Sequence, residues 1–279
     1  ETWYGADENF SRKVGQQGWI GLNWPKEHGG AGRSSMERYV ILEEMLTAGA
    51  PVGAHWISDR QSGPLIIRYG TEKHQKELLP GILKGESYFC IGMSEPDSGS
   101  DLAALRTKAE KKGDIYLVNG TKLWTSGAHR CQYMIALFRT SQEEDRHGGF
   151  SQFIVDLSLP GVTIRPIIDL AGRHHFNEVI FEDVEVPEDM LIGTEGNGWN
   201  QVTAELALER SGPERYLSSY MLLQELVNEF SNKNDDEGVT EIGRQMSHLT
   251  TLRQMSVSVA GMLDQGENPA LEASVVKDL

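Results

Sequence analysis

The spacing of hydrophobic and polar residues changes twice along the chain and separates three zones. Residues 1–86 carry apolar side chains at helical spacing, residues 87–193 show the alternation of short strands, and residues 194–279 return to helical spacing. We therefore predict an α+β fold with an N-terminal helical domain, a central antiparallel β-sandwich or barrel, and a C-terminal helical bundle. Both chain ends fall within helical patterns, so we expect an internal piece of a longer protein with an incomplete bundle.

Capping signals predict where the helices of the first zone begin and end. The Ser34–Glu37 segment has the Ser-x-x-Glu form of a capping box and opens one helix, which Gly49–Pro51 ends. A second helix is predicted over residues 54–69. Thr71 is the expected N-cap of a third, which should end near Pro80 because proline lacks a backbone donor.

A hairpin is the strongest local prediction of the middle zone. Asn119-Gly120 suits a type I′ turn and lies between two β-prone runs, Ile115–Val118 and Thr121–Trp124. Further short strands, with no helix between them, favour an antiparallel sandwich or barrel. These strands are predicted at residues 89–93, 133–138, 153–157, 162–168 and 179–186.

The last zone contains a predicted break and two amphipathic helices. Pro213 should interrupt the helical pattern that begins near Val202. Residues 232–237 are polar and predict a loop, and a further helix is predicted over residues 241–263. Both helices carry apolar stripes that we expect to remain uncovered in this chain. The stripes comprise Leu217, Met221 and Leu222 on the first helix, and Leu249, Leu252 and Val259 on the second.

Composition and charge exclude several classes of protein. The 279 residues carry a formal net charge of −15, and this acidic field repels the phosphates of nucleic acids. No apolar run reaches the roughly 18 residues that a membrane span needs. The two cysteines, Cys90 and Cys131, form no C-x-x-C motif, so we expect buried thiols in a reducing compartment, the cytoplasm.

Three segments carry candidate chemistry, and each has a structural alternative. The loop Met93–Asp101 concentrates hydroxyls and backbone N–H groups that can hold an anion or the polar edge of a heterocycle, or it is an ordinary β-turn. Trp124–Ser126 places an indole beside hydroxyls, which suits a flat cofactor or a core Trp at a strand end. Glu209 is a general base if it faces a pocket, and a solvated charge if it does not.

We predict no metal site. His174 and His175 are adjacent and point to opposite faces of a strand, and we find no clear set of supporting carboxylates. The other histidines show no ligand spacing and are interpreted as surface or structural residues. Gly29–Gly32 opens no strand–loop–helix unit, so tight turns are expected there.

Several segments, in collinear order, resemble the acyl-CoA dehydrogenase family over nearly the whole chain. Each motif is weak singly, but their shared order is highly specific. The motifs are Trp24–Gly32, Tyr69–Gln75, Leu79-Pro80, Leu83–Glu86, Met93–Asp101, Asn119–Ser126, Phe181–Pro187 and Gly193–Trp199. The resemblance implies three domains, at residues 1–86, 87–193 and 194–279, with FAD at their junction.

The resemblance also implies which residues hold the cofactor and the substrate. Ser94 and Ser126 would bond the edge of the flavin ring, and Trp124 would pack beside the ring, which is flat and polar only at its edge. Ser100 matches a residue that contacts the CoA portion of the substrate, and Arg210 matches an arginine near the substrate. The implied flavin contacts are Ile91, Gly92, Met93, Ser94, Gly99, Ser100, Trp124, Thr125 and Ser126.

The implied reaction is α,β-dehydrogenation of an acyl-CoA thioester to the trans-2-enoyl-CoA, with electrons passed to an electron-transfer flavoprotein. A carboxylate takes the α-proton, and the β-hydrogen leaves as hydride to flavin N5. Leu206–Arg210 resembles the isovaleryl and long-chain branch, in which the base lies on this helix, so Glu209 is the candidate base. In other members the base lies later in the chain, beyond Leu279.

One departure from the family pattern concerns assembly. The family usually carries an Arg-x-x-Phe-Gly segment after this helix, which reaches the FAD pyrophosphate of the neighbouring subunit, and residues 230–238 lack it. The departure implies that other residues bind the pyrophosphate, or that the protein forms a mixed oligomer in which only some subunits hold FAD. We expect a homo- or hetero-oligomeric dimer or tetramer. A catalytically silent partner subunit and an acyl-CoA oxidase are the alternative functions.

Overall fold

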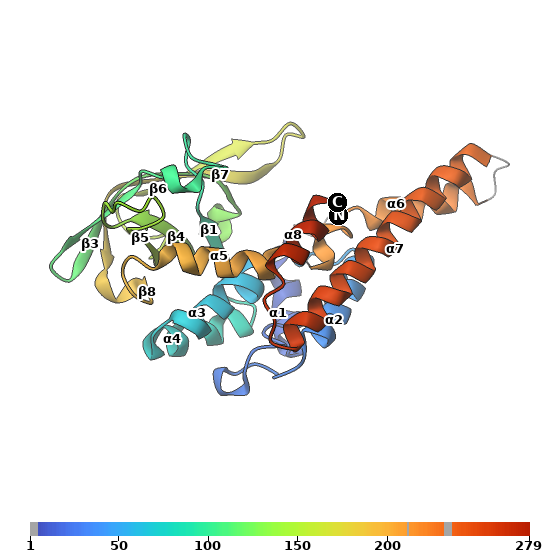
Figure 1. The fold of residues 1–279 in the computed structure, drawn as a ribbon, viewed down its shortest axis with the longest axis horizontal. Coiled ribbons are helices and arrows are strands. Elements are labelled where there is room, and N and C mark those ends of the chain that lie inside the picture. Colours follow the sequence, from blue (N-terminus) through green and yellow to red (C-terminus); the bar gives the residue numbers. More distant parts are fainter. Residues whose placement is uncertain (1–4, 211, 232–235) are drawn as a thin grey trace. The chain divides into compact units, whose positions relative to one another are not determined.

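The computed structural model describes residues 5–210, 212–231 and 236–279, except for the side chains of residues 206–209. Helices precede and follow a central sheet, which confirms the predicted α+β class (Figure 1). The chain forms two compact units. One is His55–Thr203, and the other combines Glu1–Ala54 with Ala204–Leu279. The division into three domains stays a prediction.

One mixed sheet forms the body of the unit His55–Thr203. Its strand order is β6-β7-β3-β2-β4-β5-β8, and β1 pairs with β4 off this path. Most neighbouring strands are antiparallel, as predicted, but β1 and β2 both pair with β4 in parallel. The strands are β1 (Phe89–Gly92), β2 (Lys108–Lys112), β3 (Ile115–Ser126), β4 (Tyr133–Arg139), β5 (Phe150–Asp156), β6 (Val162–Ile168), β7 (His174–Pro187) and β8 (Leu191–Ile192).

The predicted hairpin at Asn119-Gly120 is wrong, because both flanking runs belong to the single strand β3. These residues form a β-bulge, where the pairing of β3 with β7 shifts register between Val118 and Gly120. A Cβ on Gly120 would lie 2.5 Å from Oγ1 of Thr107, so only glycine fits this close approach. The true turn joins β2 to β3, where Gly113 adopts a φ of 68°.

Interlocked aromatic rings fill the core of this unit. Tyr116 and Phe153 meet edge to face with ring centres 4.8 Å apart, and Phe138 and Phe181 meet likewise at 5.4 Å. Strand β4 is buried along most of its length, because β1, β2 and β5 all pair with it. The sheet that carries the predicted flavin motifs is therefore a tightly packed scaffold.

A π-helical turn and two helices precede the sheet in this unit: Ser58–Ser62, α3 (Gly63–Tyr69) and α4 (Glu72–Leu83). Thr71 caps α4 as predicted, since its side chain accepts a hydrogen bond from the His74 backbone N–H at 3.2 Å.

Helix α4 ends at Leu83, close to the end predicted near Pro80, and the proline lies inside the helix. Leu79 and Ile82 are buried on this last turn. Their burial outweighs the single hydrogen bond that the proline cannot donate.

Helices alone build the second unit. Helix α5 begins in the sheet unit and ends in this one at Glu209, and a 3₁₀ turn at Pro213–Arg215 confirms the predicted break. The loop predicted at residues 232–237 falls mostly outside the described residues. The helices are α1 (Glu8–Gln16), α2 (Ser35–Thr47), α5 (Gly198–Glu209), α6 (Tyr220–Phe230), α7 (Asp236–Asp264) and α8 (Ala270–Asp278).

Polar contacts near both ends of α2 hold helix α7 beside it. Ser34 forms the predicted capping box with Glu37. The carboxylate of Asp264 also accepts hydrogen bonds from the first backbone N–H groups of α2, at 2.6 Å from Ser35. Further along α2, the guanidinium of Arg253 donates two hydrogen bonds, of 2.7 and 2.9 Å, to the carboxylate of Glu43.

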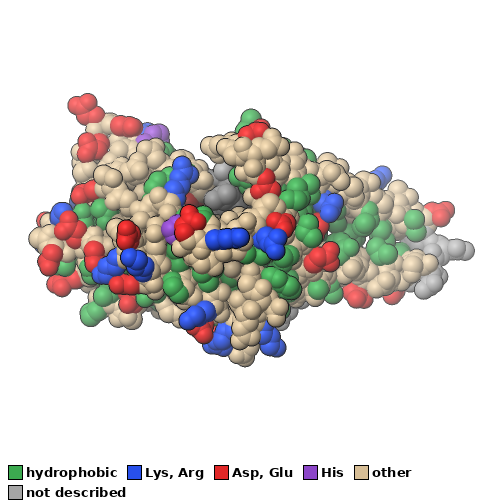
Figure 2. All heavy atoms as spheres, turned by 90° about the horizontal axis from the view of Figure 1, so that it is seen from below, with side chains coloured by type: hydrophobic (Ala, Val, Ile, Leu, Met, Phe, Trp, Pro, Cys, Tyr) green, Lys and Arg blue, Asp and Glu red, His purple; other side chains and the backbone are tan. Residues whose placement is uncertain are grey.

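The predicted exposure of both apolar stripes is partly wrong. Leu217 and Leu252 are buried with residues of α2, and Val259 is buried against α8, because the helices cover one another. Leu249 is partly buried. Leu222, by contrast, is 64% exposed. Hydrophobic side chains show over α6 and α7 in the space-filling view (Figure 2). No helix among the described residues is long and apolar enough to cross a membrane.

Candidate flavin-binding site

The two predicted flavin segments meet in the structure. The backbone N–H of Leu123, in β3, donates a hydrogen bond of 2.8 Å to the carbonyl of Ser94, in the loop that follows β1. The ammonium of Lys122 donates to the carbonyl of Met93 at 3.1 Å. Residues about 30 apart in sequence thus lie side by side in the fold.

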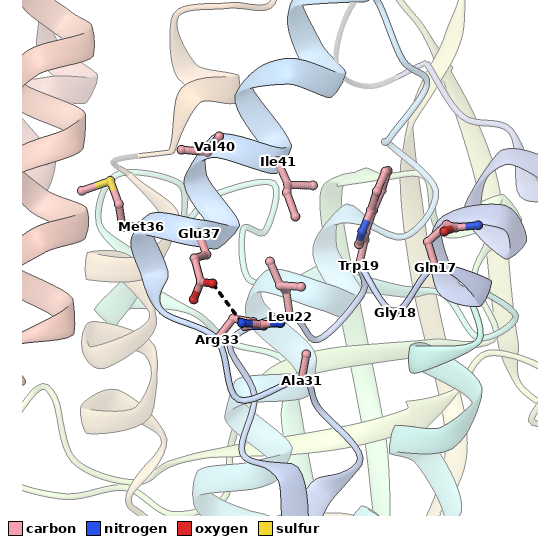
Figure 3. A pocket seen from close by; sticks show the side chains of 10 residues that line it. All are labelled: Gln17, Gly18, Trp19, Leu22, Ala31, Arg33, Met36, Glu37, Val40 and Ile41. Atoms are coloured by element: carbon pink, nitrogen blue, oxygen red, sulfur yellow. Dashed lines mark hydrogen bonds and ion pairs between the residues drawn. The ribbon is translucent and has the colours of Figure 1, made fainter.

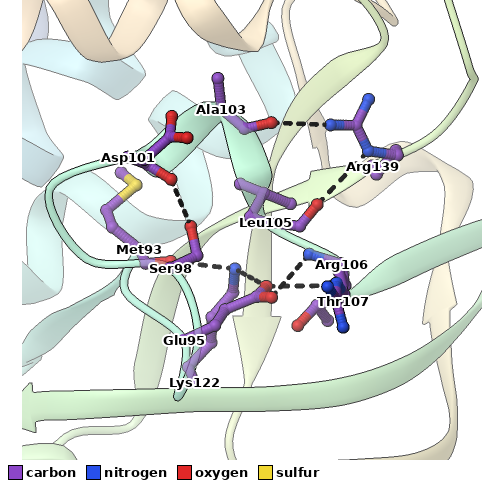
Figure 4. A network of polar contacts seen from close by, with 10 residues as sticks. All are labelled: Met93, Glu95, Ser98, Asp101, Ala103, Leu105, Arg106, Thr107, Lys122 and Arg139. Atoms are coloured by element: carbon purple, nitrogen blue, oxygen red, sulfur yellow. Dashed lines mark hydrogen bonds and ion pairs between the residues drawn. The ribbon is translucent and has the colours of Figure 1, made fainter. Parts of the chain in front are cut away.

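A buried ion pair lies behind this junction. Lys122 is withdrawn from solvent, and its Nζ lies 2.8 Å from Oε1 of Glu95 (Figure 4). The Glu95 carboxylate also accepts the backbone N–H groups of Arg106 at 2.6 Å and Thr107 at 3.0 Å. Every charge in this cluster is hydrogen-bonded, which a buried charge requires.

Burial and pairing shift the pKa of both charged groups. Burial lowers the pKa of the Lys122 ammonium to about 8, and the nearby Glu95 carboxylate opposes this shift. Burial raises the pKa of Glu95, but the charge of Lys122 and the hydrogen bond from the Arg106 backbone outweigh it. The net pKa of the Glu95 carboxyl therefore lies below its ordinary value.

The loop after β1 is closed on itself and presents its tip outward. Glu95 and Ser98 exchange backbone hydrogen bonds of 2.8 and 3.1 Å, and the Ser98 hydroxyl donates to the carbonyl of Asp101 at 2.7 Å. Gly99 and Ser100, at the tip, are exposed. The β-turn interpretation therefore describes the local geometry, and it leaves the predicted contacts Gly99 and Ser100 accessible, whereas Gly92 and Thr125 are buried.

Trp124 stands out of the sheet, so its interpretation as a core residue is wrong. Its side chain is 56% exposed. Its φ of 60° is left-handed, which is strained for an aromatic residue, and it falls at a second register shift between Lys122 and Thr125. The ring of Phe176, in β7, supports the indole edge-on at 6.0 Å between centres.

A polar cluster that the sequence did not reveal lies beside this segment. The buried amide of Asn177 donates from Nδ2 to the Thr125 carbonyl at 2.9 Å. Its Oδ1 contacts ring nitrogens of His129 and His174, whose rings stack with centres 3.8 Å apart. The two histidines are 45 residues apart and show no spacing signal. The sequence signals no pairing of these residues, because Asn177 is one of several polar residues in β7.

The residues present fit a flavin ring. An exposed indole offers a flat apolar face, and the half-buried Ser94 and Ser126 stand beside it with hydroxyls for a polar ring edge. The open space around Gly99 leaves room for a ligand, since a Cβ there would meet nothing within 4 Å. Ile91, Gly92 and Met93 lead into this loop from β1.

The predicted base and its neighbour lie where α5 ends. Glu209 is the last residue of α5, but its side chain lies outside the described part of the structure. Its neighbour Arg210 is half-buried and donates a hydrogen bond of 2.9 Å to the hydroxyl of Ser274, in α8. Glu209 as the base therefore stays a prediction.

A separate cavity of about 620 Å³ lies within the helical unit. Trp19, Leu22 and Ile41 line it, and the ion pair of Arg33 with Glu37, at 3.3 Å, lies beside them (Figure 3). None of the residues predicted to bind flavin or substrate lines this cavity.

The described residues contain no group of three or more His, Cys, Asp or Glu placed to hold a metal ion. Cys90 is buried and Cys131 is half-buried, and both are free thiols. Burial raises the pKa of the Cys90 thiol well above its ordinary value.

Two family profiles match the sequence in chain order. The profile of the acyl-CoA dehydrogenase N-terminal domain matches residues 1–86, and that of the acyl-CoA dehydrogenase middle domain matches residues 90–184.

Curated relatives agree with these matches. The acyl-CoA dehydrogenase FadE29 of Mycobacterium tuberculosis is 40% identical over 234 residues, which cover 83% of this chain and 59% of the relative. FadE26 of the same organism is 34% identical over 281 residues, which cover 95% of this chain and 69% of the relative. The chain thus spans about three-fifths of the first of these relatives.

Solved structures share the fold. A structure titled Tcur3481-Tcur3483 steroid ACAD has a TM-score of 0.91 and 30% identity, covering 99% of this chain and 73% of that one. The ChsE4-ChsE5 complex from Mycobacterium tuberculosis has a TM-score of 0.84 and 33% identity, covering 96% and 71%.

Proposed function

Because this chain belongs to the acyl-CoA dehydrogenase family, we propose that it acts in the FAD-dependent α,β-dehydrogenation of an acyl-CoA thioester. The single observation that supports this most strongly is the junction of Ser94 with Leu123. It brings a hydroxyl-rich loop beside an exposed indole, an arrangement that suits a flavin.

In this proposal, separate sets of residues bind the cofactor and the substrate. Ser94 and Ser126 hold the ring edge, Trp124 packs beside the ring, and Ile91–Met93 with Gly99, Ser100 and Thr125 complete the cradle. Bound FAD supplies the acceptor for the hydride that leaves the β-carbon. Ser100 and Arg210 bind the substrate.

Glu209 removes the α-proton in this proposal. As the β-hydrogen leaves with its electron pair, the α-carbon's bonding pair forms the new double bond, and the proton remains on the carboxylate. The product is the trans-2-enoyl-CoA. The electrons then pass to an electron-transfer flavoprotein. The carboxyl must also release its proton before the next cycle, because only the carboxylate can act as a base.

The substrate proposal can be narrowed by the likeness to a structure titled a steroid ACAD. We propose that the acyl group is bulky and steroid-derived rather than a simple straight chain. A substrate panel should therefore contain steroid-bearing, branched and straight-chain acyl-CoA thioesters at matched concentration.

A silent partner subunit is the second candidate, because residues 230–238 lack the Arg-x-x-Phe segment and a similar structure is titled as a complex of two chains. The two functions differ in a direct measurement. The full-length protein is purified alone and with its partner, and its visible spectrum is followed while the acyl-CoA panel is added.

A flavin band that bleaches with one class of acyl-CoA supports the dehydrogenase and identifies the substrate class. A flavin band that appears only in the complex and is unaffected by Ser94→Ala in this chain supports the silent subunit. Rapid reoxidation by O₂, without an electron-transfer flavoprotein, would favour an oxidase.

A further inference from the structure

We propose that Asn177 is a positioning residue for the flavin, fixing the Trp124–Ser126 segment while the stacked His129 and His174 hold its amide in place. This inference rests on the proposed function, because it assumes that the segment receives FAD. It assigns a role to three residues that no flavin motif contains.

The orientation of the Asn177 amide is set by its surroundings. Its Nδ2 lies 2.9 Å from the carbonyl of Thr125, which can only accept, so Nδ2 must be the donor. The other atom, Oδ1, must then accept hydrogen bonds from both His129 Nδ1 at 3.2 Å and His174 Nε2 at 2.7 Å. One amide therefore joins the flavin segment to two histidine rings.

The segment needs such support because its backbone is irregular. The register of β3 against β7 shifts between Lys122 and Thr125, and Trp124 adopts a left-handed φ of 60°. Regular ladder hydrogen bonds are interrupted there. The Asn177 amide and the Phe176 ring, both from β7, contact this segment directly.

The histidine pair makes this support sensitive to protonation. Two imidazolium rings stacked at 3.8 Å would repel each other, and Arg130, Arg173 and His175 also face the pair or its neighbour with positive or ionisable groups. Asp169 is a carboxylate that acts in the opposite direction on the neighbouring ring, because it raises the pKa of His175. Burial, with the charges of His174 and Arg130, lowers the pKa of His129.

The sign of the pH effect follows from these contacts. At neutral pH the pair is held with both required N–H groups pointing at Asn177. As the pH falls below the ordinary histidine value of about 6.5, His129 takes up a proton, and its charge enters a partly buried stack beside Arg130 and weakens the contact with Asn177. The Asn177 amide then loses a partner, so FAD affinity should decrease on acidification.

The test measures FAD binding to the purified apoprotein by flavin fluorescence between pH 5 and 8, together with its thermal unfolding. Asn177→Leu should raise the FAD dissociation constant by about tenfold or more at pH 7.5, because the Thr125 carbonyl loses its buried partner. The matched control is Asn119→Leu. Asn119 also bridges β3 and β7, through Asp183 at 3.0 Å, but at the other bulge. It should change the dissociation constant by less than about twofold.

A second variant keeps the test valid if Asn177→Leu fails to fold. In His129→Gln/His174→Gln, each glutamine amide can still donate to Asn177 Oδ1 but cannot take up a proton. Its FAD affinity should stay flat between pH 8 and 5, whereas that of the parent should fall. The positioning role would be overturned if FAD affinity depended on pH equally in the parent and in the double glutamine variant. An unchanged dissociation constant in a folded Asn177→Leu protein would also overturn it. Failure of the parent itself to bind FAD would instead overturn the proposed function on which it rests.

Discussion

The Lys122 ammonium and the Glu95 carboxylate form an ion pair of 2.8 Å with almost no access to solvent. Lys122 belongs to β3 and Glu95 to the loop after β1, so the pair ties together the two segments that we assign to the flavin. Lys122 also donates to the Met93 carbonyl, one residue before Ser94. The ion pair therefore fixes the position of the loop and the position of the strand end together.

Removal of one partner should be costly. We expect Lys122→Met to lower the free energy of unfolding by about 3–5 kcal/mol, because it leaves the Glu95 charge buried without its counter-ion. The double variant Lys122→Met/Glu95→Gln should recover part of this loss, measured by urea denaturation. Strict additivity of the two single changes would show that the pair is not coupled.

The same pair predicts an acid-dependent loss of stability. The folded-state pKa of Glu95 lies below its unfolded value, so its contribution is fully present above about pH 4.3 and is lost as the pH falls through the folded-state pKa. Thermal unfolding across this range should show a shallower decline in Lys122→Met/Glu95→Gln than in the parent. Glu110→Gln, at an exposed carboxylate of β2, serves as the control and should follow the parent curve.

The flavin placement predicts a loss of cofactor on removal of two hydroxyls. Ser94→Ala/Ser126→Ala should lose FAD or shift its absorbance, because each unpaired ring-edge group costs roughly 1–3 kcal/mol. Flavin content and the visible spectrum are compared with those of Ser158→Ala, which removes an exposed hydroxyl after β5. A spectrum and content equal to the parent's would reject this placement.

Glu209→Gln tests the catalytic base. The variant should retain FAD and still bind acyl-CoA, while flavin bleaching by substrate slows by about 10²–10⁴, because glutamine cannot accept the α-proton. Stopped-flow bleaching isolates this step from electron delivery. A rate within a few-fold of the parent would place the base elsewhere, in a segment beyond Leu279.

Exposed apolar residues on α6 predict an assembly contact. Leu222 and Leu226 are 64% and 42% exposed, and we expect an oligomer to cover them. Leu222→Glu/Leu226→Glu should shift the full-length protein towards smaller species in light scattering. Asn228→Glu, on the same helix, provides a charge control. A full-length protein that is monomeric at all concentrations would contradict this prediction.

Local sequence signals determined much of this protein. The capping box at Ser34 and the N-cap at Thr71 form as predicted, because a cap depends only on residues three positions apart. Most strands of the middle zone and the break at Pro213 also follow from local pattern, although β2 and β8 fall where no strand was predicted. The motifs of the two predicted flavin segments are readable from the sequence, whereas their contact exists only in the fold.

Only the tertiary structure decided the rest, since it depends on partners far apart in the chain. Asn119-Gly120 is a strong turn signal locally, but pairing with β7 on one side and the close approach of Thr107 made it a bulge. His129 and His174 acquired a joint role only because β7 places Asn177 beside Thr125. A pattern of single residues cannot encode such a contact, because its energy depends on burial and geometry that exist only in the folded sheet.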